Sequence, residues 1–534
     1  MLRALTFIAI AALSLRAGEL DDLERQAKDK EYGAYWDRTK AFGKLAKIGS
    51  VKAAQAVLPH CGDEEPAVRE YAGLAVADFS EKEAVAWLAA NGAALRSAEG
   101  RATVYWAFGV SGNEAYFPAL EKAAGPGERD AAARAMAVRA IGMFGNKGKE
   151  EVLVAALKDP AWQVKEEAAF ALFDRRSTAA AEPLAKLLTD AAWQPHAAAL
   201  YALGAGAPDK FREALPKAQK DKSYEVRIAA CEGAFEAGQE DGFGAAGVAL
   251  KDEAWQVRVA AIAVMEQVWE NRCIEPLIDA MVKEKGRLRY DFTMALRRMT
   301  GKEIGFNAAD WKLWWNTAKD TFKIGKKPSK RGANIAVGSG GTEVAFYDVP
   351  ILSDRIGFTI DFSGSMFDDD QKTGGSGEQK GRKQIDIALE EFQKTVQALK
   401  PDVKINLLVM STQAIIEKVR VFSKLLVSVS AARPKILTWA FDAKKKLEPI
   451  KRGRGDMWDA YEELMADEDI DTMFILSDGG PSYGACVDKA HFLVELRRSN
   501  RYRKVMIHTV LTGKGAEKFM EDMAEMTGGQ AVTK

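Results

Sequence analysis

The chain has 534 residues, more than one hydrophobic core usually organises, so we expect at least two domains. Lys and Arg together number 76, and so do Asp and Glu, which excludes a strong net field directed at nucleic acid or an anionic membrane surface. Hydrophobic residues make up 47% of the chain, which excludes a largely disordered protein.

Residues 1–17 have the pattern of a secretory signal peptide. Arg3 precedes an apolar run from Ala4 to Leu15, and the small residues Ala17 and Gly18 follow it. The run has about a dozen residues, too few to span a bilayer, and no later segment reaches that length. We therefore expect an exported protein, periplasmic or extracellular. An uncleaved anchor at a membrane interface is the alternative.

Export would permit disulfide bonds, but the four cysteines lie far apart and form no Cys-x-x-Cys pair. We expect them to be small buried apolar residues. A bridge between Cys231 and Cys273, which fall in adjacent repeats, is the alternative. The other two are Cys61 and Cys486.

A repeating motif indicates that residues 46–325 form an array, after a helical lead-in at 18–45. The motif reads Asp, two residues, Trp or Tyr, one residue, Val or Pro, and then Lys, Arg or His. It begins at four evenly spaced positions: Asp159, Asp190, Asp221 and Asp252. Extending the spacing in both directions gives about eight units.

Each unit reads as two helices. In one unit, apolar residues recur at helical spacing, and Asp252 is placed to cap the first helix. These apolar residues are Val257, Ala261, Val264 and Val268. The second helix is expected over residues 274–282. Neither helix can bury its apolar face alone, so stacked neighbours must complete the core of an α-solenoid.

The motif, followed by alanine-rich helices, resembles HEAT-like repeats. The repeat is shorter than the usual HEAT unit, so the short HEAT-like repeats seen in bilin lyases are the nearer comparison. We expect the recurrent aromatic residue to pack between repeats, and the recurrent Asp and basic residue to pair or to cap helices.

An aromatic helix around Trp311, Trp314 and Trp315 should cover the exposed end of the solenoid, since terminal repeats need an atypical face. A partner-binding role is the alternative. Residues 326–342 are basic and contain Pro and Gly, which is typical of a linker between domains.

Two apolar strands in the last third of the chain end in oxygen-bearing side chains. The strand at 355–361 leads into Asp361, Ser363 and Ser365, and the strand at 472–477 leads into Asp478. Parallel strands present their carboxyl ends at one edge of a sheet, so these groups can meet there. Hard oxygen ligands suit Mg²⁺ better than a soft metal.

This D-x-S-x-S sequence with a later strand ending in D-G resembles the von Willebrand factor type A (VWA) domain, over residues 343–534. The resemblance implies a doubly wound, Rossmann-like α/β fold. It also implies a metal-ion-dependent adhesion site, in which Asp361, Ser363, Ser365 and Asp478 hold Mg²⁺, or Mn²⁺ or Ca²⁺, directly or through water.

One position departs from the family pattern. In the middle loop the family has a threonine that assists the metal, and this chain has Gly455 there. Asp456, one residue later, is therefore a further candidate ligand.

The remaining segments alternate between helices and strands, which is typical of an α/β domain. The expected helices are 385–399, 436–446, 458–465, 487–498 and 517–526, and the further strands are 405–410, 415–421 and 505–511. A polar insert at 368–383 is expected to be a solvated loop.

Motifs of common enzyme classes are absent from the sequence, and its four histidines show no metal-ligand spacing. We expect His508, within a strand, to be a satisfied core residue. The hypothesis is an exported, non-enzymatic binding or adhesion protein whose metal site receives an acidic side chain of a protein partner. A metal-free scaffold is the first alternative, and a lyase-like or chaperone-like protein is the second.

Overall fold

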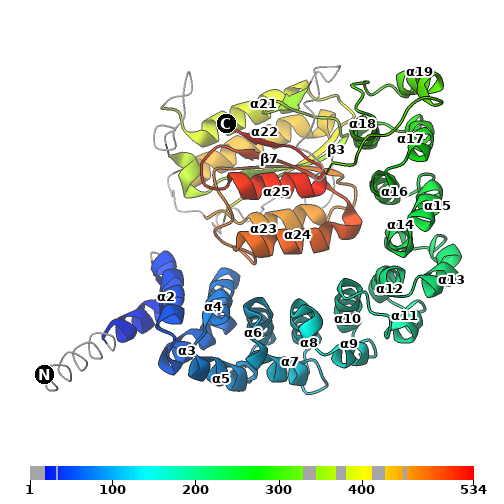
Figure 1. Cartoon of the computed structure of the whole chain (residues 1–534). Helices are drawn as coiled ribbons and strands as arrows, with labels where there is room; N and C mark the ends of the chain where they lie inside the picture. The colour runs from blue at the N-terminus through cyan, green and yellow to red at the C-terminus, as the bar shows by residue number, and fades with distance from the viewer. Residues whose placement is uncertain (1–17, 32–33, 329–343, 369–380, 412–426, 449–453) are drawn as a thin grey trace, which may run out of the picture. The chain divides into compact units, whose positions relative to one another are not determined.

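The computed structural model describes residues 18–31, 34–328, 344–368, 381–411, 427–448 and 454–534 (Figure 1). The chain forms two compact units that divide between Gln239 and Glu240. The predicted signal peptide, the centre of the polar insert, the predicted strand at 415–421 and most of the predicted linker lie outside the described residues. None of the helices in the described part of the chain is long and apolar enough to cross a membrane.

The first unit is a stack of helix pairs in two layers. In one layer each helix packs on the next, from α2 through α4, α6, α8, α10 and α12 to α14, and shorter helices between them form the other layer (Figure 1). The helices are α2 (Tyr35–Ile48), α3 (Val51–Val57), α4 (Pro66–Asp78), α5 (Lys82–Asn91), α6 (Ala98–Ser111), α7 (Phe117–Ala123), α8 (Ala131–Met143), α9 (Glu150–Ala156), α10 (Trp162–Asp174), α11 (Ala181–Leu187), α12 (Trp193–Gly206), α13 (Pro208–Ala218) and α14 (Tyr224–Ala237). The predicted all-helical array is confirmed.

The repeated motif builds a ladder of ion pairs between neighbouring repeats. Arg134 pairs with Asp159 at 2.7 Å, and Lys165 pairs with Asp190 in the same way one repeat later. The expectation that the recurrent Asp and basic residues pair is confirmed. At the aromatic position the exposure varies, because Trp162 is 37% exposed whereas Trp193, Tyr224 and Trp255 are partly buried. The packing of this residue between repeats stays a prediction.

The motif aspartates do not occupy the N-cap. Asp252 accepts a hydrogen bond from the backbone N–H of Ala254 at 2.8 Å, and Ala254 is the residue that precedes α16. The prediction that Asp252 caps this helix is therefore wrong by two residues. The same bond joins Asp159 to Ala161, so the Asp closes a turn before the helix rather than the helix itself.

The second unit begins with the last helices of the array. These are α15 (Gln239–Ala249), α16 (Trp255–Val268), α17 (Ile274–Met281), α18 (Gly286–Thr300) and α19 (Ala308–Ala318). Helix α19 packs on α17 and buries Trp311 and Trp315, as expected for a helix that covers the end of the array. The four cysteines are free and buried, so the alternative of a bridge between Cys231 and Cys273 is wrong.

A six-stranded sheet forms the rest of this unit. The strand order is β5-β4-β3-β6-β7-β8, and every pairing is parallel except that of β5 with β4. The strands are β3 (Arg355–Asp361), β4 (Lys404–Met410), β5 (Val427–Ser428), β6 (Thr472–Ser477), β7 (Met506–Leu511) and β8 (Ala531–Thr533), with a separate hairpin of β1 (Ala345–Phe346) and β2 (Val349–Pro350). The C-terminal region thus has the predicted parallel-rich sheet.

Helices cover both faces of this sheet. Alternate strand residues point to opposite faces, so Leu407 lies in the core beside α21 and α22, and Leu408 lies in the core beside α23, α24 and α25. The helices are α21 (Gln384–Ala398), α22 (Val429–Leu447), α23 (Met457–Met465), α24 (Lys489–Arg503) and α25 (Glu517–Thr527). Helix α22 begins at Val429 rather than near residue 436, because Val429 and Ala432 supply further buried contacts.

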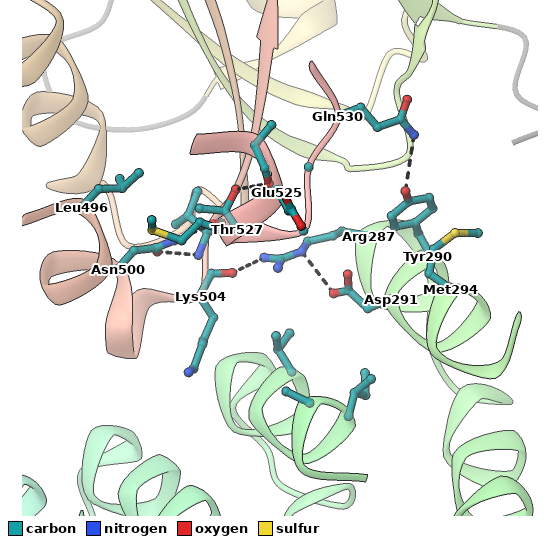
Figure 2. A pocket seen from close by; sticks show the side chains of 18 of the residues that line it. Arg287, Tyr290, Asp291, Met294, Leu496, Asn500, Lys504, Glu525, Thr527 and Gln530 are labelled. Atoms are coloured by element: carbon teal, nitrogen blue, oxygen red, sulfur yellow. Dashed lines mark hydrogen bonds and ion pairs between the residues drawn. The ribbon is translucent and has the colours of Figure 1, made fainter. Parts of the chain in front are cut away.

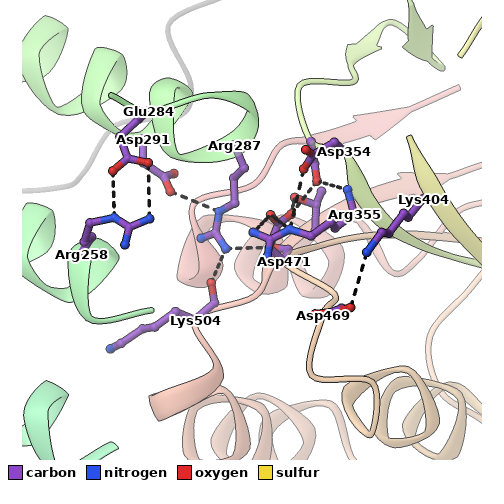
Figure 3. Close-up of polar contacts among 12 residues, drawn as sticks. Arg258, Glu284, Arg287, Asp291, Asp354, Arg355, Lys404, Asp469, Asp471 and Lys504 are labelled. Carbon is purple, nitrogen blue, oxygen red and sulfur yellow. Dashed lines mark hydrogen bonds and ion pairs between the residues drawn. The ribbon is translucent and has the colours of Figure 1, made fainter. Parts of the chain in front are cut away.

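Within the second unit, α16 and α18 contact the sheet at the edge where its parallel strands begin, beside a cavity of about 670 Å³ (Figure 2). Arg287 of α18 donates hydrogen bonds to the backbone carbonyls of Asp471, at 2.8 Å, and of Lys504 (Figure 3). The guanidinium groups of Arg287 and Arg355 each lie 5.3 Å from the ring centre of Trp255. The last repeats and the sheet therefore form one compact unit.

Candidate functional site

The candidate site lies where the neighbouring strands β3 and β6 end. Asp361 is the last residue of β3 and is 3% exposed. Its carboxylate accepts hydrogen bonds from the backbone N–H of Ser363, at 2.7 Å, and from the hydroxyl of Ser477, at 2.5 Å. Because Ser477 is the last residue of β6, these bonds hold the ends of both strands together.

Two hydroxyl groups stand beside this carboxylate. A short 3₁₀ helix over Gly364–Phe367 is anchored by the buried side chains of Met366 and Phe367. The turn sets the Oγ atoms of Ser363 and Ser365 3.2 Å apart, and Ser365 hydrogen-bonds to Asp478. The structure thus brings together four of the five predicted ligands: Asp361, Ser363, Ser365 and Asp478.

The electrostatics of the site favour a cation. Burial, and then the charge of Asp478, raise the pKa of Asp361 to about 7. Burial also raises the pKa of Asp478, and the charge of Asp368 raises it further. Buried carboxylates that repel one another are unstable as anions unless a positive charge compensates them.

The middle loop forms a third wall of the site. A Cβ atom added to Gly455 would lie 3.4 Å from Oδ2 of Asp361, so this position faces the carboxylate as the sequence comparison expects. The backbone N–H of Gly455 donates to Oγ of Ser482 at 3.1 Å, and the N–H of Ser482 donates to the carbonyl of Gly455 at 3.2 Å. The sequence did not predict Ser477 and Ser482 as residues of the site. The only sign of them in the sequence is that each carries a hydroxyl within four residues of Asp478.

The structure assigns a different position to Asp456. Its carboxylate accepts the backbone N–H of Asp459 at 3.2 Å, which makes it the N-cap of α23. It also lies against Gly484, where an added Cβ would come within 2.1 Å of Oδ1. Burial, and then the charge of Asp459, raise the pKa of Asp456 to about 7. Its contacts are therefore those of a helix cap and not those of the group around Asp361.

The arrangement suits ion binding better than nucleophilic catalysis. Ser363 and Ser365 have a carboxylate and each other as neighbours, and no histidine or lysine base contacts them among the described residues. His508 is 5% exposed, and its Nδ1 accepts the backbone N–H of Gln530 at 3.0 Å. The prediction that His508 is a satisfied core residue is confirmed.

Comparison with known families identifies the repeats. Residues 89–172 and 117–204 match the family described as HEAT repeats. The N-terminal region is built of HEAT-like repeats. No curated protein matches the chain.

Several solved structures are similar to part of the chain. The complex of CpcE and CpcF of phycocyanin lyase from Nostoc sp. PCC7120 is 18% identical, with 49% of this chain and 94% of that chain covered and a TM-score of 0.29. The Escherichia coli protein YibA is 17% identical, with 51% and 97% covered and a TM-score of 0.35. Human deoxyhypusine hydroxylase in complex with glycerol is 18% identical, with 48% and 98% covered and a TM-score of 0.23.

Proposed function

We propose that this chain is an exported, non-enzymatic binding protein in which a HEAT-like solenoid carries a VWA domain with a metal-ion-dependent adhesion site. The observation that carries the proposal is the convergence of a buried carboxylate (Asp361), a partly buried one (Asp478) and two hydroxyls at the ends of β3 and β6. Solenoids of this type bind proteins along extended surfaces, which agrees with a scaffold role.

The donor set fits a hard divalent cation. Asp361, Ser363, Ser365 and Asp478 offer carboxylate and hydroxyl oxygens only, which Mg²⁺ and Mn²⁺ prefer and Ca²⁺ also accepts. The raised pKa of Asp361 agrees with this fit, because a nearby cation would stabilise the ionised carboxylate. A bound ion would supply a positive charge with an open coordination position.

The partner that suits such a site is a protein with an accessible acidic side chain. The chain's own residues hold the donor oxygens in place through the bonds to Asp361 and the two-way contact between Gly455 and Ser482. A carboxylate on the partner would then complete the coordination of the ion.

A metal-free interaction scaffold is the second candidate. The observation that favours it is Gly455, which brings no hydroxyl to the wall that faces Asp361. Metal binding separates the two candidates, because only the first requires it.

The test is titration of the full chain with Mn²⁺, followed by calorimetry and by electron paramagnetic resonance. We expect one weak site per chain that Asp361→Asn abolishes. The control Asp348→Asn removes a carboxylate whose side chain is 82% exposed and should bind as the wild type does. Wild-type protein without a saturable Mn²⁺ signal would overturn the metal site in favour of the metal-free scaffold.

A further inference from the structure

A second reactive group lies within the second unit, where the chain enters α24. The thiol sulfur of Cys486 lies 3.5 Å from Nδ1 of His491, which is within hydrogen-bond distance for sulfur. The other ring nitrogen of His491, Nε2, lies 3.5 Å from Oε1 of Glu495, one turn further along the helix. A nucleophile beside a base that a third group orients is the usual arrangement around a reactive side chain. Neither the HEAT-like repeats nor the proposed metal site accounts for it.

The start of α24 holds the imidazole ring beside the thiol. Asp488 is the N-cap of this helix and accepts the backbone N–H of His491 at 2.8 Å, so His491 lies in the first turn. The next residue, Phe492, packs edge-on against Trp458 with the ring centres 5.0 Å apart. Both aromatic residues belong to the same buried cluster as Cys486. The helix cap and this cluster therefore fix the ring and the thiol relative to each other.

The three groups run from the core toward solvent. Cys486 is 2% exposed, whereas the side chains of His491 and Glu495 are 18% and 21% exposed. Residues four apart lie on the same side of a helix, so Glu495 reaches the outer nitrogen of the ring and leaves the inner one to the thiol. A proton of the thiol can thus leave through the ring, and only a reagent about the size of water can reach the sulfur.

Carboxylates around the ring favour its protonated form. Glu495 and the N-cap Asp488 belong to α24 and its start, and Asp459 and Glu462 approach from α23. Asp459 accepts the backbone N–H of Ala485 at 3.4 Å. Burial, and then the charge of Asp459, raise the pKa of Glu462, and the charge of Glu495 adds to this rise. A positive imidazole relieves the repulsion among these groups, and it also stabilises a thiolate at its other nitrogen.

Two other cysteines of the chain provide a contrast. Burial raises the pKa of Cys61 to about 12 and the pKa of Cys273 to about 11. Both thiols therefore stay protonated at neutral pH, and a protonated thiol is a poor nucleophile. Since Cys486 is buried as they are, burial alone does not distinguish it, and the imidazole at 3.5 Å does.

We propose that Cys486 is a peroxide-reactive thiol, with His491 as its base and Glu495 as the residue that orients the ring. His491 takes the proton of the thiol, and the thiolate sulfur attacks one oxygen of hydrogen peroxide. The O–O bond breaks, and the departing hydroxide takes the proton back from His491 to form water. The sulfur loses two electrons to the peroxide and becomes a sulfenic acid. The inference is independent of the metal site.

The test treats the folded full chain with hydrogen peroxide in the presence of dimedone, which traps sulfenic acids, and follows the adduct at each cysteine by mass spectrometry. We expect the adduct at Cys486 to form at least about tenfold faster than that at Cys61 or Cys273 at about pH 7. His491→Gln keeps a polar side chain but removes the base, and should slow the reaction of Cys486 at least about tenfold. Unchanged rates at Cys61 and Cys273 in this variant show that its fold is intact.

The pH dependence of the same reaction separates a base from a merely structural residue. The wild type should reach half of its maximal rate at Cys486 at least about one pH unit below His491→Gln. Glu495→Gln removes the orienting charge and should lie between the two. Glu521→Gln is the matched control, because it makes the same change at an exposed position of the adjacent α25 and should match the wild type.

The comparison among the three cysteines of the wild type needs no variant, so it decides the point even if His491→Gln does not fold. Equal adduct rates at Cys486, Cys61 and Cys273 would overturn the proposal. An unchanged rate and pH profile in folded His491→Gln would overturn it as well. A pH profile of Glu495→Gln that coincides with that of the wild type would overturn the role of Glu495.

Discussion

The hydroxyl of Ser477 donates a 2.5 Å hydrogen bond to Oδ2 of Asp361, and so joins the last residues of two adjacent parallel strands. Both residues are buried, at 1% and 3% exposure. The bond also opposes the rise in the pKa of Asp361, because it stabilises the ionised carboxylate. Ser477 thus positions Asp361 and keeps it available as an oxygen donor.

Ser477→Ala should lower the free energy of unfolding by about 1.5–3 kcal/mol at pH values where Asp361 is ionised, since a hydrogen bond to a charged group contributes about that much. Urea denaturation at about pH 8, above the raised pKa of Asp361, measures the change. Ser430→Ala, at an exposed position, is the control and should change stability by less than about 0.5 kcal/mol. Equal effects of the two substitutions would show that the bond does not stabilise the fold.

Asp456→Ala should leave metal affinity unchanged and lower stability by about 1 kcal/mol, because the side chain caps α23. Asp456→Asn keeps the cap and removes the charge, so it should match the wild type in stability. Calorimetric titration with Mn²⁺ and thermal unfolding of both variants make the comparison. If both variants lose metal affinity by about tenfold or more, the carboxylate is a ligand after all.

The position of the site could be predicted from the sequence because the ends of parallel strands share one edge. The apolar runs of β3 and β6 marked the two strands, and Asp361 and Asp478 marked their ends. Ser477 could not be assigned, because its contact depends on the register of β3 with β6, which pairs Ile360 with Leu476. A single sequence does not encode that register in any recognisable pattern.

The contact of the last repeats with the sheet also could not be predicted from the sequence. Trp255 occupies the same motif position as Trp162, which is 37% exposed. Only the structure shows that the guanidinium groups of Arg287 and Arg355 each lie 5.3 Å from the ring centre of Trp255. The motif at Trp255 therefore makes a further contact near the end of the array, where Arg355 of the sheet lies beside it as well as Arg287 of the next repeat.

The export hypothesis predicts a mature chain that begins near residues 15–19 and is found outside the cytoplasm. The reason is the short apolar run after Arg3, which suits cleavage better than membrane anchoring. N-terminal sequencing of protein from its native source decides the point. Retention of Met1 on a soluble cytosolic protein would contradict it.

Stability should fall in acid through His508. Burial, and then the charge of Arg287, lower the pKa of His508 to about 3 from its ordinary value of 6.5. Between these two values the unfolded chain binds a proton that the folded chain does not. The contribution of this group is thus fully present above about pH 6.5 and is lost as the pH falls toward 3, at a slope of at most about 1.4 kcal/mol per pH unit.

His508→Asn removes the titrating group and offers Oδ1 to the backbone N–H of Gln530 in place of Nδ1. Urea denaturation of both proteins from about pH 8 to about pH 4 should show a difference in unfolding free energy that changes steadily below about pH 6.5. The other three histidines are common to both proteins and cancel in the difference. Parallel stability curves would show that the folded chain protonates His508 as readily as the unfolded chain does.

Gly455→Thr should tighten binding of Mg²⁺ and Mn²⁺ by about tenfold, which is the effect of one added ligand worth about 1.4 kcal/mol. The added Cβ would lie 3.4 Å from Oδ2 of Asp361, an ordinary contact distance, and the backbone at Gly455 is not left-handed, so the position accepts a side chain. Gly455→Val is the matched control, because valine has the shape of threonine without its hydroxyl. Calorimetric titration of the three proteins then separates two effects. If Thr tightens binding and Val does not, the missing hydroxyl limits the affinity of the site. If both variants tighten binding equally, the mobility of the loop limited the affinity and the hydroxyl is irrelevant. If neither variant tightens binding, Gly455 is not a ligand position, and the departure from the VWA pattern has no consequence for the ion.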